Sequence, residues 1–88
     1  MTIVYAQTRK DAEEVVGIFV DARKRGEDVM CADVNIKTLD GEKISGKYCR
    51  AIDKKTRSTK RTLLVLNMAR ESAKKVVRDV KIKKITDY

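Results

Sequence analysis

The residues of this chain that could do chemistry are mostly lysines and arginines, and they are densest between residues 53 and 61. This stretch, DKKTRSTKR, carries five cations and one acid. Lysine and arginine contact phosphate groups, and the hydroxyls of Thr56, Ser58 and Thr59 can donate to phosphate oxygens. The stretch therefore predicts a contact with a polyanion. The alternative is a solvated loop whose charge serves only solubility.

Other chemistries lack the residues they need. The chain contains no histidine, which excludes Ser-His and Cys-His nucleophile pairs. Two cysteines alone cannot complete a four-ligand zinc site. The scattered glycines form no phosphate-binding loop. The carboxylates that could serve as general acids or bases are better explained by solvation or by turn formation than by catalysis. These residues are Glu13, Glu14, Asp33, Asp40 and Asp53. We expect a protein that is not an enzyme and that holds no metal and no cofactor.

Length and charge restrict the choice of partner. A chain of 88 residues makes one domain, residues 1–88, with a single modest core. Its formal net charge of +8 attracts polyanions, so nucleic acid is the expected partner. Acidic proteins, anionic membrane surfaces and a surface adapted to heat are the alternatives. No apolar stretch is long enough to span a membrane and the start lacks a signal-peptide pattern, so we expect a cytoplasmic protein without membrane contact.

The first part of the chain predicts a strand and then a helix. Residues 2–6 (TIVYA) form a short apolar run of β type. Thr8 is a good N-cap, and apolar residues then recur at helical spacing, which predicts a helix over about 9–25. Gly26 is expected as its C-cap, with the preceding Arg23, Lys24 and Arg25 complementing the helix dipole.

The next two segments alternate in polarity and predict a β-hairpin. They cover residues 29–38 and 42–53. A three-residue loop with Gly41 in the left-handed position places both apolar sets on one face. This register sets Cys31 opposite Cys49 and Asp33 opposite Lys47, on the outer face of the hairpin. The two α-carbons should then lie within about 7 Å. Whether the cysteines are reduced, or oxidised as in a thermophile, stays open.

The last third predicts a strand, a helix and a strand. RTLLVLN at 61–67 is a continuous apolar run expected inside the sheet, residues 68–79 keep helical spacing, and the tail can form a last strand. The predicted order is β-α-β-β-β-α-β. The expected fold is of the α+β class, a two-layer sandwich with a mostly antiparallel sheet and two helices on one face.

That architecture predicts a basic surface. With both helices on one face, Lys37, Lys43 and Lys47 would project from the open face of the hairpin. The loop residues would hang from the end of the same sheet: Lys54, Lys55, Arg57, Lys60 and Arg61. Only four aromatic residues occur, and nothing resembles a pair that stacks bases. We therefore expect recognition of the phosphate backbone and of shape, with an affinity that falls with salt.

A resemblance to a known family rests on the run KYCRAIDKKTRSTKRTLLVLNMARESAKK at 47–75. Its order is a strand ending in a basic residue, a Lys-rich loop, a β-branched strand and a helix. The unit at about 9–79 thus resembles the small Alu-domain subunits of the eukaryotic signal recognition particle. This chain differs from those subunits in its additional strands, one at the N-terminus and one after the second predicted helix. Those subunits bind RNA on the exposed sheet face as a dimer. The resemblance implies contacts from Lys37, Lys43, Lys47, Arg50 and the loop at 54–61.

A second resemblance is to the double-stranded-RNA-binding domain. RESAKK at 70–75 is similar to the lysine-bearing start of its second helix, although the basic residues are not in the order KK-x-AK. Both resemblances favour RNA over DNA. The sequence thus predicts a small, basic, non-catalytic protein that binds structured RNA or duplex. The alternative is a protein-protein interaction module without nucleic acid, a homodimer formed through an edge strand at 2–6 or 80–85.

Overall fold

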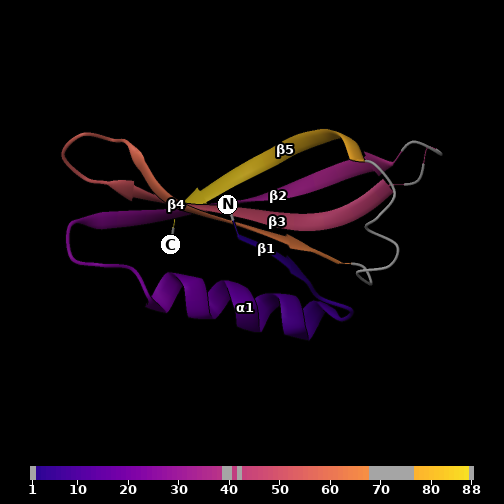
Figure 1. The fold of residues 1–88 in the computed structure, drawn as a ribbon, viewed down its shortest axis with the longest axis horizontal. Coiled ribbons are helices and arrows are strands. Elements are labelled where there is room, and N and C mark those ends of the chain that lie inside the picture. Colours follow the sequence, from indigo (N-terminus) through magenta and orange to yellow (C-terminus); the bar gives the residue numbers. More distant parts are fainter. Residues whose placement is uncertain (1, 39–40, 42, 68–76, 88) are drawn as a thin grey trace.

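The computed structural model describes residues 2–38, 41, 43–67 and 77–87, and side chains over 2–36, 41 and 43–67 (Figure 1). One helix lies against one face of a five-stranded sheet whose order is β1-β4-β3-β2-β5. β1 runs parallel to β4, and the other three pairings are antiparallel. The elements are β1 (Thr2–Tyr5), α1 (Arg9–Asp21), β2 (Glu27–Thr38), β3 (Lys43–Asp53), β4 (Thr59–Leu66) and β5 (Val77–Asp87).

The predicted fold class was wrong. The described residues form a mostly-sheet fold with one helix, not a sandwich with two helices in the order β-α-β-β-β-α-β. Residues 68–76 of the predicted second helix lie outside the described residues, and β5 begins at Val77, inside the predicted helix. Val77 and Val80 fit helical spacing, but β-branched residues also favour strands. The long antiparallel pairing of β5 with β2 stabilises the strand conformation of residues 77–87, and the sequence pattern could not reveal this pairing.

Helix α1 begins where the sequence predicted and ends earlier. The Thr8 side chain accepts a hydrogen bond from the Asp11 backbone N–H at 3.1 Å, so the predicted N-cap is confirmed. The helix ends at Asp21 with Ala22 as its C-cap, which makes the prediction of Gly26 as the C-cap wrong. Gly26 instead has a φ of 87° in the turn that enters β2.

The predicted register of the β2–β3 hairpin is confirmed. Cys31 pairs with Cys49 and Asp33 with Lys47. The two cysteines form a disulfide, and their α-carbons lie 4.0 Å apart. The predicted three-residue loop at 39–41 lies outside the described residues except for Gly41, whose φ is 87° as expected.

The face that the helix covers was predicted wrongly. Helix α1 packs on the side of Cys31 and Cys49, which was expected to be the open side. The reason is local, because at this end of the hairpin the odd-numbered residues are small or apolar and let a helix approach closely. The cluster under α1 contains Ala6, Val16, Val29, Cys31, Cys49, Ala51, Leu63 and Val65.

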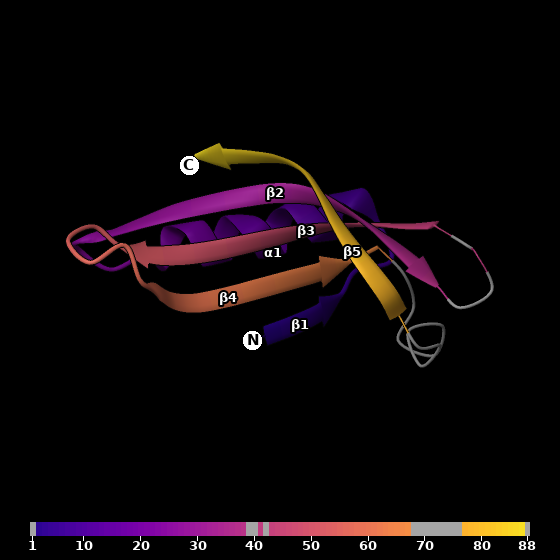
Figure 2. The same ribbon diagram turned by 90° about the horizontal axis from the view of Figure 1, so that it is seen from above.

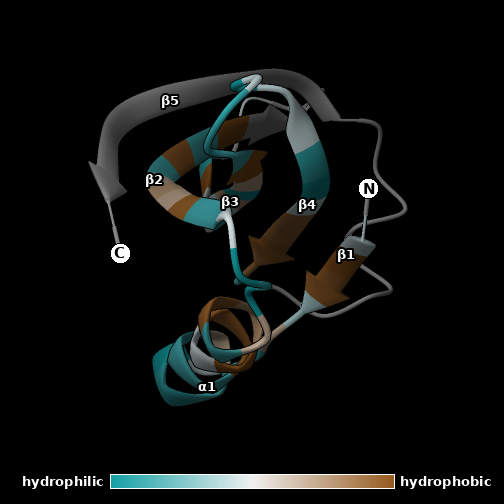
Figure 3. Cartoon of the chain, turned by 90° about the vertical axis from the view of Figure 1, so that its left-hand side faces the viewer, coloured by the Kyte–Doolittle hydropathy of each residue, from teal (hydrophilic) through white to brown (hydrophobic). Residues whose placement is uncertain are grey.

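A second apolar cluster lies on the opposite face of the sheet. It contains Val34, Ile36, Leu64 and Leu66, with Ile44 and Tyr48 packed against it. β5 arches over this side of the sheet, away from α1 (Figures 1 and 2). A register shift next to Val34 aligns three apolar residues of β5 with apolar residues of β2, as Val80 with Ile36, Ile82 with Val34 and Ile85 with Ala32. Figure 3 shows β5 and α1 on opposite sides of the strands.

Candidate nucleic-acid interface

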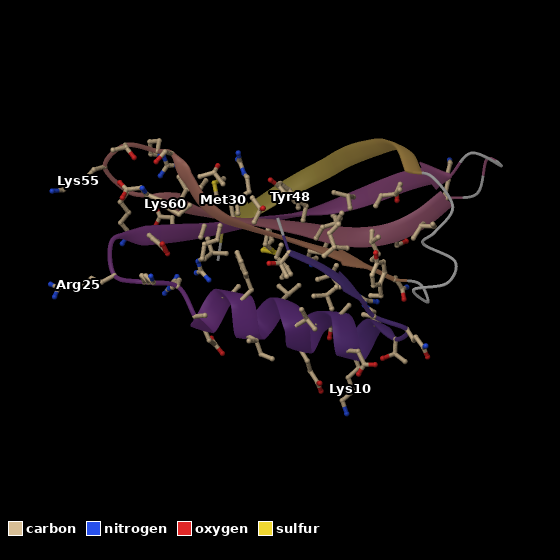
Figure 4. The ribbon with its side chains drawn as sticks, viewed as in Figure 1. Lys10, Arg25, Met30, Tyr48, Lys55 and Lys60 are labelled. Atoms are coloured by element: carbon tan, nitrogen blue, oxygen red, sulfur yellow. A yellow bond between two sulfur atoms is a disulfide. The ribbon has the colours of Figure 1, made fainter. Side chains whose placement is uncertain are left out.

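Two basic loops that are distant in the sequence meet at one end of the sheet. The loop after α1 carries Arg23, Lys24 and Arg25, and the turn between β3 and β4 carries most of the charged stretch. The backbone N–H of Lys54 donates to the carbonyl of Gly26 at 2.9 Å, which joins the two loops. Arg25 and Lys55 project outward at this end of the molecule (Figure 4). We call it the basic end, made of Arg23, Lys24, Arg25, Lys54, Lys55, Arg57, Lys60 and Arg61.

The net charge of this end is strongly positive. Residues 21–28 and 53–61 together hold eight cationic and four acidic residues, so their formal net charge is +4, half of the +8 of the whole chain. Residues 54–60 are all exposed. A cluster of exposed cations of this density attracts a polyanion, with a strength that depends on ionic strength.

Ion pairs orient two cations of the β3–β4 turn without neutralising the basic end. Asp28 lies 3.2 Å from Nη1 of Arg57 and 3.9 Å from Nζ of Lys54. Both cationic side chains are more than half exposed, so the pairs add little to stability, typically ~0–1 kcal/mol each. Their consequence is orientation: one carboxylate from β2 positions two cations of the β3–β4 turn.

The turn itself is built around Asp53. Its side-chain Oδ1 accepts hydrogen bonds from the backbone N–H groups of Lys55 at 2.9 Å and Thr56 at 3.0 Å. These bonds lower the pKa of Asp53 below its ordinary value of 3.8. The bond from Thr56 is the largest cause of the shift, and the bond from Lys55 is the second. Arg57 takes a left-handed backbone conformation with a φ of 61°. The turn is therefore held in one shape by its own backbone before any ligand arrives.

Arg61 connects the basic end to the helix. Its guanidinium lies 4.8 Å from the centre of the Phe19 ring and donates to the carbonyl of Ala22 at 3.3 Å. Its Nη2 also lies 3.6 Å from a carboxylate oxygen of Glu27. The Arg61 side chain is about one-third exposed. This predicted site residue thus has a structural role, fixing the end of α1 against β4.

The loop after α1 was missed as part of the site. From the sequence, the last turn of the helix was predicted to contain Arg23, Lys24 and Arg25, whose charges would complement the dipole. The helix ends before them, so that interpretation is wrong. The signal for this loop in the sequence is Gly26, because glycine favours a turn into the next strand as well as a helix C-cap.

The structure does not bring all predicted site residues together. Lys43 pairs with Lys37 at the far end of the hairpin, and Lys43 is 11 residues from Lys54, or about 36 Å of extended strand. Lys47 lies on the side of the sheet that α1 covers, with its Nζ 3.4 Å from Asp33. Arg50 lies along β3, paired with Met30 and Thr62. The predicted residues are therefore spread along the sheet, from the basic end through Arg50 and Lys47 to Lys37 and Lys43 at the opposite end.

A groove of about 610 Å³ between α1 and the β2–β3 strands lies nearer the opposite end. Its charged lining has both signs: Arg9, Lys47, Glu13, Asp21 and Asp33. Three carboxylates against two cations make this groove unsuited to a polyanion.

Other kinds of site find no support in the part of the chain that the structure describes. Among the described residues, no three acidic or cysteine side chains gather as a metal site would require. No described helix is both long and apolar enough to cross a membrane. Comparison with protein-family models, with curated proteins and with solved structures finds no match for this chain.

Proposed function

We propose that this protein binds nucleic acid without catalysis and that the basic end contacts the phosphate backbone. The observation that carries the proposal is the meeting of two basic loops, joined by the Lys54–Gly26 hydrogen bond, with Lys54 and Arg57 of the β3–β4 turn oriented by Asp28. Pre-positioned cations lose less conformational entropy on binding than cations on a mobile loop do.

The arrangement of aromatic residues supports contacts with the backbone rather than with bases. Phe19 has the guanidinium of Arg61 over its ring, and Tyr48 packs against the second apolar cluster. Tyr5 lies in β1, and Tyr88 lies outside the described residues. Sequence-tolerant binding of single strands depends on open aromatic faces. We therefore propose structured RNA or duplex as the ligand, with RNA favoured over DNA by the resemblances described above.

Salt dependence is the first test. About five phosphate contacts would give a slope near −4.5 for log K against log salt on a duplex. Fluorescence anisotropy with duplex RNA, duplex DNA and single strands between low and high salt measures this slope. We expect duplex binding with a steep slope. Binding to none of the three ligands, or a slope near zero, would contradict the proposal.

A pair of charge-matched variants tests the location of the site. The variant Arg25→Gln with Lys55→Gln removes two cations that project from the basic end (Figure 4). The control Lys10→Gln with Lys43→Gln removes two exposed cations elsewhere, one on α1 and one at the far end of β3. Two lost phosphate contacts should lower the slope by about 2, and affinity should fall roughly tenfold or more at low salt in the basic-end variant alone. Equal losses in both variants would mean that net charge, not this site, drives binding.

The cytoplasmic location expected from the sequence is likewise a proposal, and the disulfide makes it more specific. Disulfides are rare in a reducing cytosol, with intracellular proteins of hyperthermophiles as the exception. Cys31 and Cys49 are 1% and 0% exposed, so a reductant would reach them only when the fold opens. The share of charged residues, 39%, also fits a surface adapted to heat. We propose a cytoplasm of that kind, and thiol trapping in intact source cells would test it.

The homodimer that the sequence offered as an alternative has one observation in its favour. β1 lies at one edge of the sheet, where it can pair with another strand. Such a dimer is compatible with nucleic-acid binding.

A further inference from the structure

The outer side of β1 offers a row of backbone groups to a partner strand. In a parallel pair, the N–H and C=O of one residue both point toward the same neighbouring position in the sheet. The next residue along the strand points both groups the opposite way. The N–H of Ala6 donates to the carbonyl of Leu66 in β4 at 2.9 Å, so the even-numbered residues Thr2 and Val4 also point toward β4. The backbone groups of Ile3 and Tyr5 therefore face away from the sheet.

This edge lacks the protection that sheet edges usually carry. β1 reads TIVY and has no charge and no proline, in a chain in which 39% of residues are charged. The strand at the other edge, β5, reads VRDVKIKKITD and has six charged residues in eleven. Charge of this kind discourages strand addition, so β1 is the better edge for pairing.

Apolar side chains are exposed on both sides of the same edge. In the described part of the chain, the exposed large apolar side chains are Ile3 at 45%, Tyr5 at 38% and Ile18 at 70%. The register pairs Ile3 with Leu64 and Tyr5 with Leu66, on the face opposite α1. Ile18 borders a shallow groove between α1 and β1, together with Val4, Val15 and Phe19.

We infer that two copies of this chain associate edge to edge, β1 antiparallel to β1 of the second copy, with the two α1 helices side by side on one face of the doubled sheet. A peptide strand added to β1 would cover Ile3 and Tyr5 and leave Ile18 in water. A second copy brings its own α1, so it covers the apolar side chains on both sides of the edge at once. A two-fold axis makes the contact self-complementary.

The charges of this region permit the approach of a second copy. Residues 2–21 hold two cationic and four acidic residues, a formal net charge of −2 within a chain of +8. Antiparallel helices would also place the acidic first half of one α1, with Asp11 and Glu14, toward Arg25 of the other copy. Opposite charges thus meet at this contact, whereas the positively charged remainder of the surface would repel a second copy.

The dimer would deepen the proposed function, and this consequence rests on it. Because antiparallel strands reverse the direction of the second copy, the two basic ends would lie at opposite ends of the doubled sheet. One long duplex could then contact both, and linkage of two sites raises the apparent affinity above that of one.

Sedimentation equilibrium of the full chain at about 5–200 µM is the experiment. The chain mass is 10.0 kDa, and we expect a species of twice that mass. Ile3→Lys adds a charge on the edge, and Tyr5→Pro removes an outward N–H that no strand of the sheet uses. Both variants should sediment as monomers with an unchanged far-UV circular dichroism spectrum. Ser45→Lys, which adds the same charge on an exposed side chain of an interior strand, should stay dimeric.

Two results would overturn the inference. One is a wild type that is monomeric throughout this concentration range. The other is association that survives both edge variants, for example a salt-sensitive contact between the acidic helix of one copy and the basic end of another. The variant Lys54→Gln with Lys55→Gln separates the two proposals, because it removes two exposed cations of the basic end and leaves Arg25 in place, so it should lose duplex affinity and remain a dimer. Loss of the dimer with duplex binding intact would overturn the dimer alone.

Discussion

Reduction of the Cys31–Cys49 disulfide is the perturbation whose effect follows most directly from the structure. The bond joins β2 to β3 beneath α1 and closes a loop of 18 residues. Its sulfurs belong to side chains that are 1% and 0% exposed. We expect the reduced protein to keep its fold, since the hairpin ladder and the packing under α1 remain, and to be markedly less stable.

The magnitude comes from the entropy of the unfolded chain. Closing a loop of 18 residues lowers that entropy by enough to stabilise the fold by about 3 kcal/mol at 25 °C. An unfolding entropy near 2.1 cal/mol/K per residue gives roughly 0.18 kcal/mol/K for this chain of 88 residues. Reduction should therefore lower Tm by about 17 °C.

The assay compares oxidised and reduced wild type by thermal and urea unfolding. The reduced sample is prepared in denaturant with a phosphine reductant and refolded in its presence, with two free thiols counted afterwards. The control is the variant Cys31→Ala with Cys49→Ala, whose Tm should not respond to the reductant. In native buffer, thiols should appear only as fast as the fold opens, because both sulfurs are buried.

An unchanged Tm in a sample with two titrated thiols would refute this reasoning. It would mean that the unfolded chain is already constrained near the hairpin, so the cross-link removes no entropy. Immediate reduction in native buffer would contradict the burial of the disulfide beneath α1.

Four further predictions concern local structure. Gly17→Ala should stabilise the protein by roughly 0.5–1 kcal/mol in urea unfolding, because an added Cβ meets nothing within 4 Å in the middle of α1. Gly46→Ala should cost about 1–3 kcal/mol in the same assay, because its Cβ would lie 2.6 Å from the carbonyl oxygen of Val65; an equal effect at both glycines would contradict these contacts. Thr8→Ala should cost about 1 kcal/mol and Thr8→Ser much less, since serine keeps the capping oxygen. The lowered pKa of Asp53 means that its carboxylate stabilises the fold above the unfolded value near 3.8 and that this contribution is lost as the pH falls through the folded pKa. Unfolding midpoints measured between about pH 2 and 7 should therefore decline less steeply in acid for Asp53→Asn than for wild type, and identical slopes would refute a role for the turn.

Local patterns in the sequence predicted the parts of the fold that depend on neighbouring residues. The Thr8 cap, the start of α1 and the strand character of five segments follow from propensity and periodicity over a few residues. The pairing of Cys31 with Cys49 follows from parity, because one turn length alone aligns the two apolar sets of the hairpin.

Long-range contacts decided what these patterns left open. Both faces of the hairpin carry apolar residues, at Cys31 and Cys49 on one side and at Val34 and Ile36 on the other. A local pattern cannot tell which face receives α1 and which lies under β5. The pairing of β5 with β2 likewise decides that residues after 76 form a strand, although the spacing of their valines also fits a helix.

The candidate interface divides in the same way. The sequence by itself determined that the chain is basic and that residues 53–61 concentrate its charge, because composition needs no fold. Tertiary structure alone decided that the loop after α1 joins that stretch at one end, and that Lys37 and Lys43 lie at the opposite end of the hairpin. The physical reason is that a sheet sorts residues by strand direction and register, which bring residues 24–26 and 54–57 together and separate lysines only eleven positions apart.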